Sequence, residues 1–145
     1  MNRRIILTIV FNFFILIGAG HGIGFLGLFE ILGFKEFIAG DVKFSLSGDH
    51  ENRLFTAAII SLVGQIILLR SFYEKALLTK FTIIYVGLFI LFFSFFVLAN
   101  DLFNSELDAF SFWTGTPFLI FAIMLLVRTI KNHRSLLNEN KEPSS

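Results

Sequence analysis

Four long stretches without a charged residue constrain this chain more than any other feature of its sequence. A helix that crosses the hydrocarbon layer of a membrane needs roughly 20 apolar residues, and each stretch approaches or exceeds that length. The shortest is completed by flanking arginines, whose apolar stems stay in the lipid while their charges reach water. We therefore predict an all-α integral membrane protein, a four-transmembrane-helix bundle. The predicted spans cover residues 5–29, 54–70, 81–100 and 109–128.

The composition supports a membrane protein and excludes several other classes. Of the 145 residues, 55% are hydrophobic, 16% are charged and 21 are phenylalanine, whereas soluble domains carry about 25% charged residues. The absence of cysteine excludes thiol catalysis, cysteine-ligated zinc and iron–sulfur clusters. The net charge of +1 gives no overall attraction to nucleic acid. We expect a single membrane domain over residues 1–145, surrounded by lipid bilayer, with no cofactor and no metal.

The placement of lysine and arginine predicts the orientation in the membrane. Nine of the twelve lie before the first span, between the second and third spans, or after the fourth. Because cytoplasmic segments collect such residues, we predict that both termini are cytoplasmic. An even number of spans agrees with this, since it places the two termini on the same side of the membrane. The short loops and the phenylalanine-rich composition are typical of a bacterial inner membrane protein. The predicted cytoplasmic basic face comprises Arg3, Arg4, Arg70, Lys75, Lys80, Arg128, Lys131 and Arg134.

The first residues also resemble a secretory signal peptide, because a basic start precedes an apolar run. The apolar run continues well beyond a normal signal core, and residues 17–19 match a cleavage site poorly. We therefore expect this segment to be retained as the first span.

Residues 34–53 form the only substantial predicted segment outside the membrane, a small extracytoplasmic flap. Apolar and polar residues alternate over residues 42–47, which favours a short hairpin. The apolar residues within 34–38 fit an interfacial helix equally well. After the fourth span, residues 129–145 are expected to be a cytoplasmic tail that begins as helix.

Polar residues within the spans indicate which helix faces point inward, because polar groups in hydrocarbon need partners. Along straight helices, Asn12 lies about 12 Å from Arg4, while Gln65 and Ser61 lie about 8 and 14 Å from Arg70. We therefore predict inner-half contacts from Asn12 to Ser61 or Gln65. These contacts either hold helices together or form a polar site, and the first interpretation is favoured.

A second polar set is predicted near the outer ends of the spans. His21, Ser94, Thr114 and Thr116 fall at similar depths, with Glu30 near the same level. Together they could form a ligand or proton site beneath the flap, since histidine titrates near neutral pH. The simpler interpretation, which we favour, is an interfacial histidine that bonds to a nearby carbonyl or hydroxyl.

Closely spaced glycines in the first span predict a surface for helix packing. Glycines four residues apart let helix backbones approach closely, which is typical of packed transmembrane pairs. The same glycines weaken a helix, so the alternative is a local unwinding near His21. The predicted seam, which would also support a homo-oligomer, comprises Gly18, Gly20, Gly22, Gly24 and Gly27.

No catalytic motif is present, and we expect a protein that is not an enzyme. The chain has no HExxH or GxSxG motif, and every acid is expected at or outside the membrane interface. The predicted function is a non-catalytic, self-associating membrane subunit that acts as a sensor or anchor for a cytoplasmic protein partner, as an immunity or phage-defence component would. The alternative is binding or transport of a small molecule, lipid or ion through the polar outer-half site around His21.

Overall fold

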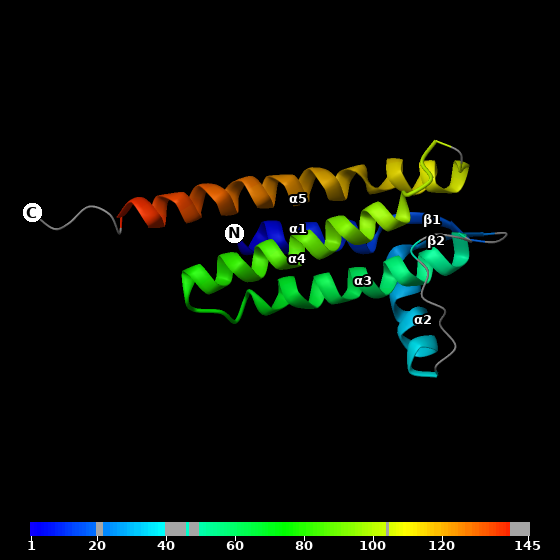
Figure 1. The fold of residues 1–145 in the computed structure, drawn as a ribbon, viewed down its shortest axis with the longest axis horizontal. Coiled ribbons are helices and arrows are strands. Elements are labelled where there is room, and N and C mark those ends of the chain that lie inside the picture. Colours follow the sequence, from blue (N-terminus) through cyan, green and yellow to red (C-terminus); the bar gives the residue numbers. More distant parts are fainter. Residues whose placement is uncertain (20–21, 40–45, 47–49, 104, 140–145) are drawn as a thin grey trace, which may run out of the picture.

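The computed structural model describes residues 1–19, 22–39, 46, 50–103 and 105–139. These residues form five helices and one two-stranded hairpin, and three of the helices are long and lie side by side (Figure 1). In chain order the elements are α1 (Asn2–Phe13), β1 (Leu16–Ala19), β2 (Gly22–Phe25), α2 (Leu26–Ala39), α3 (His50–Arg70), α4 (Leu77–Leu98) and α5 (Glu106–Glu139).

Three helices are long and apolar enough to cross a membrane. The stretches Arg53–Arg70, Leu77–Leu98 and Glu106–Asn138 each contain an 18-residue window of high mean hydropathy, 1.6, 2.6 and 1.9 respectively. They contain most of the second, third and fourth predicted spans. Helix α5 continues well past residue 128, so the predicted tail does begin as helix. Helix α2 likewise includes residues 34–39, so the first part of the predicted flap is helical, whereas residues 42–44 lie outside the described residues.

The prediction of one continuous helix over residues 5–29 is wrong. Helix α1 ends at Phe13, and β1 and β2 then pair as an antiparallel hairpin in which Leu16 opposes Phe25 and Ala19 opposes Gly22. Glycine weakens the interior of a helix and of a strand alike, so the pairing of β1 with β2, rather than the glycines themselves, holds this segment as a hairpin. With 12 residues, α1 is about 18 Å long, which is too short to cross a hydrocarbon layer of roughly 30 Å.

The hairpin is tied to the helices on either side of it. The backbone N–H of Leu26 donates to the carbonyl of Ile15 at 2.8 Å and so continues the pairing to the start of α2. The hydroxyl of Thr114 on α5 donates to the carbonyl of Leu16 at 2.8 Å. The hairpin is therefore held against α5, whereas α2 departs steeply from the long helices and packs on α3 (Figure 1).

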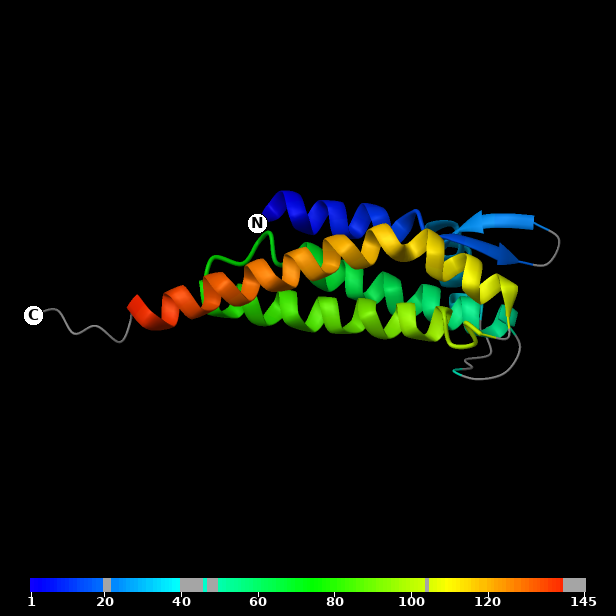
Figure 2. The same ribbon diagram turned by 90° about the horizontal axis from the view of Figure 1, so that it is seen from above.

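Both ends of the described chain lie at the same end of the bundle as the α3–α4 connection (Figures 1 and 2). Arg4 Nη1 donates to the carbonyl of Met124 at 3.1 Å, which fixes the start of α1 beside α5. The hairpin, α2 and the α4–α5 connection lie at the opposite end (Figure 2). The segments that carry the predicted basic face are thus gathered at one end of the molecule.

Small residues do bring two helices close together, but these helices are α3 and α4. A Cβ atom added to Gly64 would lie 2.8 Å from Leu91 Cδ2, and one added to Gly87 would lie 2.8 Å from Leu68 Cδ2. Each glycine therefore receives a leucine from the facing helix. Because the backbone N of Leu68 would also lie 3.2 Å from a Cβ on Gly87, α3 cannot make room by a side-chain movement alone.

Gly87→Leu should consequently destabilise the protein by about 1–3 kcal/mol, the usual cost of overpacking a core. Val86→Leu places the same side chain on the neighbouring position of α4, which is 45% exposed, and should change stability by less than about 0.5 kcal/mol. Thermal unfolding in detergent, followed by circular dichroism, checks both variants. Equal unfolding temperatures for the two variants would contradict this packing.

A buried ion pair joins the beginnings of α3 and α5. Arg53 Nη1 lies 2.9 Å from Asp108 Oδ2, and Arg53 Nη2 lies 3.3 Å from Asp108 Oδ1, with the two side chains 7% and 0% exposed. The backbone N–H of Asp101 donates to Asp108 Oδ2 at 2.8 Å, and the Ser105 hydroxyl donates to Oδ1 at 3.2 Å. This ion pair was not expected from the sequence.

Asp108→Ala should lower the free energy of unfolding by about 3–5 kcal/mol, because it leaves the Arg53 charge buried without a partner. The double variant Arg53→Met with Asp108→Leu should recover most of that loss, since both charges are then absent. Chemical denaturation of the two variants and the native chain measures the difference. A single variant as stable as the native chain would exclude a structural role for the pair.

Candidate functional site

A buried polar cluster lies where α1, α2 and α3 meet. Asn12 comes from the last turn of α1, Glu30 from α2, and Ser61 and Gln65 from α3. Their exposed fractions are 0%, 2%, 0% and 6%. Ser61 and Gln65 are four residues apart and so share a helix face. The hairpin reverses the chain after Asn12, so that α2 brings Glu30 back to the level of α3 at which Asn12 lies.

Two residues of α3 donate hydrogen bonds to both of the other members. Ser61 Oγ lies 2.6 Å from Asn12 Oδ1 and 2.8 Å from Glu30 Oε1, so its single hydrogen serves two acceptors. Gln65 Nε2 donates to Asn12 Oδ1 at 2.8 Å and to Glu30 Oε1 at 2.7 Å. The Glu30 carboxylate is therefore held by neutral donors, which contact only one of its two oxygens.

The second carboxylate oxygen of Glu30 has no hydrogen-bond donor among the described residues. This atom, Oε2, is not among the described side-chain atoms that are fully buried without a partner, which are Asn12 Nδ2 and Arg53 Nε. Glu30 also lines a pocket. An acceptor atom is thus left open at the polar end of that pocket.

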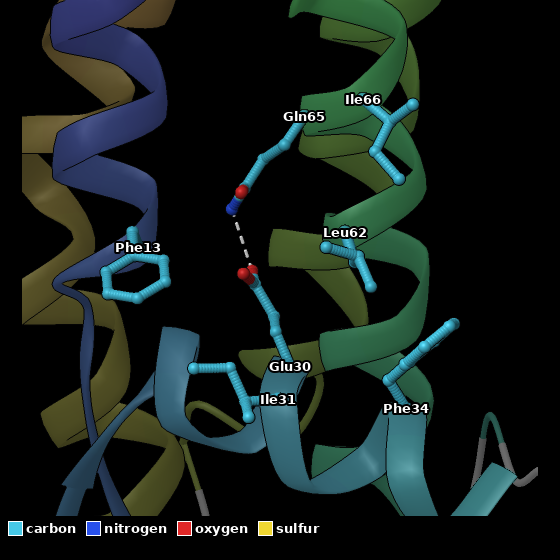
Figure 3. A pocket seen from close by; sticks show the side chains of 7 residues that line it. All are labelled: Phe13, Glu30, Ile31, Phe34, Leu62, Gln65 and Ile66. Carbon is cyan, nitrogen blue, oxygen red and sulfur yellow. Dashed lines mark hydrogen bonds between the residues drawn. The ribbon is translucent and has the colours of Figure 1, made fainter. Parts of the chain in front are cut away.

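The pocket has a volume of about 430 Å³ and lies between α1, α2 and α3 (Figure 3). Glu30 and Gln65 point toward each other at one side of it, and the remaining walls are apolar (Figure 3). The apolar lining residues are Phe13, Ile31, Phe34, Leu62 and Ile66.

Burial dominates the electrostatics of Glu30. Helix α2 lies outside the three candidate spans, and burial there raises the pKa of Glu30 above its usual range, while the hydrogen bonds from Ser61 and Gln65 oppose this rise. Every acid was expected at or outside the membrane interface, and the structure places Glu30 beside Ser61 and Gln65 of the candidate span Arg53–Arg70.

The residues predicted as inner-half contacts are brought together, whereas the described hydroxyls of the outer-half set bond to separate partners. Glu30, assigned to the outer set, belongs to the cluster with Asn12, Ser61 and Gln65. His21 lies outside the described residues. The three outer hydroxyls donate separately to backbone carbonyls: Ser94 to Ala57 at 2.7 Å, Thr114 to Leu16 at 2.8 Å and Thr116 to Phe112 at 3.2 Å.

The predicted glycine seam does not lie along one helix. Gly18 is in β1, Gly22 and Gly24 are in β2, and Gly27 is in α2, while Gly20 lies outside the described residues. A Cβ atom on Gly18 would overlap the side chain of Leu107, and one on Gly27 would overlap the ring of Phe13. Both glycines therefore permit close packing within one chain. The break after Phe13 removes the helical spacing on which the seam depended.

Comparison with protein-family models, with curated proteins and with solved structures found no match. The function is therefore inferred from the geometry of the pocket and its polar cluster.

Proposed function

We propose that this chain is a non-catalytic, multi-pass membrane protein that binds a small amphipathic molecule in the pocket between α1, α2 and α3. The observation that carries the proposal is a carboxylate oxygen without a described hydrogen-bond donor, on a residue that lines an otherwise apolar pocket. Ligand sites in proteins are typically concave and mostly apolar, with a few polar groups that orient the ligand.

A membrane environment is supported by the outward faces of the long helices. Large apolar side chains on these faces are exposed, including Phe89 at 73%, Phe96 at 66% and Ile120 at 53%. Extended apolar surfaces of this kind are solvated by lipid tails rather than by water. We infer that the bilayer surrounds α3, α4 and α5.

The N-terminal segment would supply a fourth crossing in two parts. Helix α1 adds about 18 Å, and the four residues of β1 add about 13 Å, which together approach the hydrocarbon thickness of roughly 30 Å. The open edges of a two-stranded hairpin carry backbone groups that lipid tails cannot satisfy. β1 would therefore cross the outer part of the hydrocarbon against protein rather than lipid, as where Thr114 of α5 donates to the carbonyl of Leu16.

The basic end of the molecule would face the cytoplasm, with both termini there, in the inner membrane of a bacterium. Because the chain has no cysteine, single cysteines can report this orientation. Leu46→Cys should react with a membrane-impermeant maleimide in intact cells, whereas Lys75→Cys and Ser135→Cys should react only after the cells are opened. Labelling of Lys75→Cys in intact cells would reverse the proposed orientation.

The rim of the pocket supports entry of the ligand from the bilayer. Ile31, Phe34 and Ile66 line the pocket and are 64%, 51% and 57% exposed. Their exposed surfaces are apolar, so a molecule dissolved in lipid can reach the pocket sideways between α2 and α3 without crossing water.

The pocket favours the ligand-binding alternative over the self-associating subunit. Self-association was expected from a glycine seam along one helix, and the hairpin interrupts that helix. Ligand binding was expected around His21 and is proposed instead at Glu30, which lines the pocket. Whether a cytoplasmic partner binds the basic face is a separate proposal that the pocket does not require.

Photolabelling in proteoliposomes tests the pocket. A long-chain alcohol that carries a diazirine should label pocket residues, and an excess of unlabelled alcohol should compete with this labelling. Ile66→Trp adds bulk at the pocket and should abolish the competed labelling. Ile120→Trp makes the same change at a similarly exposed position of α5 and should leave it unchanged. Peptide mass spectrometry reads the labels, and identical labelling of both variants would exclude this pocket as the site.

A further inference from the structure

We propose that the occupant of this pocket is an amphipathic amine, whose ammonium group pairs with Glu30 Oε2 and whose apolar chain lies against the pocket walls. This inference rests on the proposed binding function and names its ligand class. The ligand is defined by chemistry: one positive, hydrogen-bond-donating group attached to an apolar body.

Glu30 lacks a positively charged partner among the described residues of the pocket. The hydrogen-bonding partners of Glu30 are neutral, and no lysine, arginine or histidine is among the described residues that line the pocket. A buried carboxylate without a cation is costly in its charged form. An ammonium ion in the pocket would supply the missing opposite charge.

The other charged side chains that the structure describes on α1, α2 and α3 are directed elsewhere. Arg53 on α3 pairs with Asp108, and Arg4 on α1 donates to the carbonyl of Met124. Arg3 on α1, Lys35 on α2 and Arg70 on α3 are exposed and do not line the pocket. The strands β1 and β2 carry no charged residue. Among the side chains that the structure describes, none competes with an incoming cation for Glu30.

The hydrogen bonds of the Glu30 carboxylate also favour a ligand that donates. Oε1 already accepts from Ser61 and Gln65, whereas Oε2 accepts from no described residue. A protonated amine has donors and no acceptor, so it matches an open carboxylate oxygen. An anionic headgroup would be repelled there, and a neutral alcohol would donate a hydrogen bond without supplying the opposite charge.

Aromatic side chains also favour a cation in this pocket. The rings of Phe13 and Phe34 line the same pocket, from α1 and α2 respectively (Figure 3). Aromatic faces attract cations as well as apolar chains. Both parts of an amphipathic amine therefore find a suitable surface within one pocket.

Binding of the amine should release a proton. Without a cation in the pocket, a carboxyl group buried among neutral groups favours its protonated form. The ammonium ion would then replace the carboxyl proton, which leaves to water, and the carboxylate would retain the electron pair of the broken O–H bond. The charge in the pocket is unchanged by this exchange, because one positive charge enters as another leaves.

Competition against the diazirine alcohol tests the ligand class. Dodecylamine and dodecanol are compared as competitors in phosphatidylcholine vesicles, which contain no anionic headgroup. In the native chain at neutral pH, dodecylamine should compete at least about tenfold more strongly than dodecanol, as a charge-assisted hydrogen bond predicts. Glu30→Gln should bring the two competitors to parity and retain labelling by the alcohol. Glu106→Gln, at an exposed position of α5, should preserve the native preference.

Two measurements keep the proposal testable if Glu30→Gln does not fold. Lowering the pH protonates Glu30 while dodecylamine stays charged, so the preference of the native chain for the amine should disappear. Because the pKa of Glu30 is raised to about 7, a pH indicator in weak buffer should record about half a proton released for each amine bound at neutral pH, and more as the starting pH is lowered by about one unit. Competed labelling with no preference for the amine would overturn this inference alone. The absence of any competed labelling would overturn the proposed function itself. A preference for dodecylamine over dodecanol without proton release would overturn the proposed replacement of the carboxyl proton by the ammonium ion.

Discussion

A buried carboxylate that has only neutral partners is the constraint on which the N-terminal part of the structure depends. Glu30 is 2% exposed, and its hydrogen bonds come from the same two residues of α3 that hold Asn12. Because an unpaired polar group is costly to bury, α1 and α2 must both approach α3 at one level. The chain therefore has to turn back between Asn12 and Glu30, and the hairpin provides that reversal.

The hairpin in turn depends on backbone hydrogen bonding. Its two strands satisfy each other along one edge only, and the carbonyl of Leu16 on the other edge of β1 is satisfied by Thr114. A hairpin with open edges is tolerated where water or protein supplies partners, but not among lipid tails. This explains physically why the hairpin lies at the end of the bundle, beside the beginning of α5, while the long helices form the middle (Figure 2).

The sequence predicts the parts of the fold that depend on local character, and it fails where the chain changes direction. Helices α3, α4 and α5 follow from long apolar stretches, because each is helical almost throughout. An apolar, glycine-rich stretch is equally compatible with helix and strand, so hydropathy alone did not show the break after Phe13. Depth counted at about 1.5 Å per residue placed Asn12 correctly beside Ser61 and Gln65, because Asn12 precedes the break. The same count misplaced Glu30, which follows it.

Glu30 of α2 and Asp108 of α5 are both buried, but Asp108 has a positively charged partner and the hydrogen-bonding partners of Glu30 are neutral. Asp108 is matched by the Arg53 guanidinium and by further donors on both oxygens, so its charge is neutralised within the chain. Glu30 is equally buried but has neutral partners on one oxygen and borders a pocket of about 430 Å³. A carboxylate needed only for stability would gain from a partner such as Arg53. An acid left without a cation, beside a space large enough for a ligand, is better explained by a charge that arrives with that ligand.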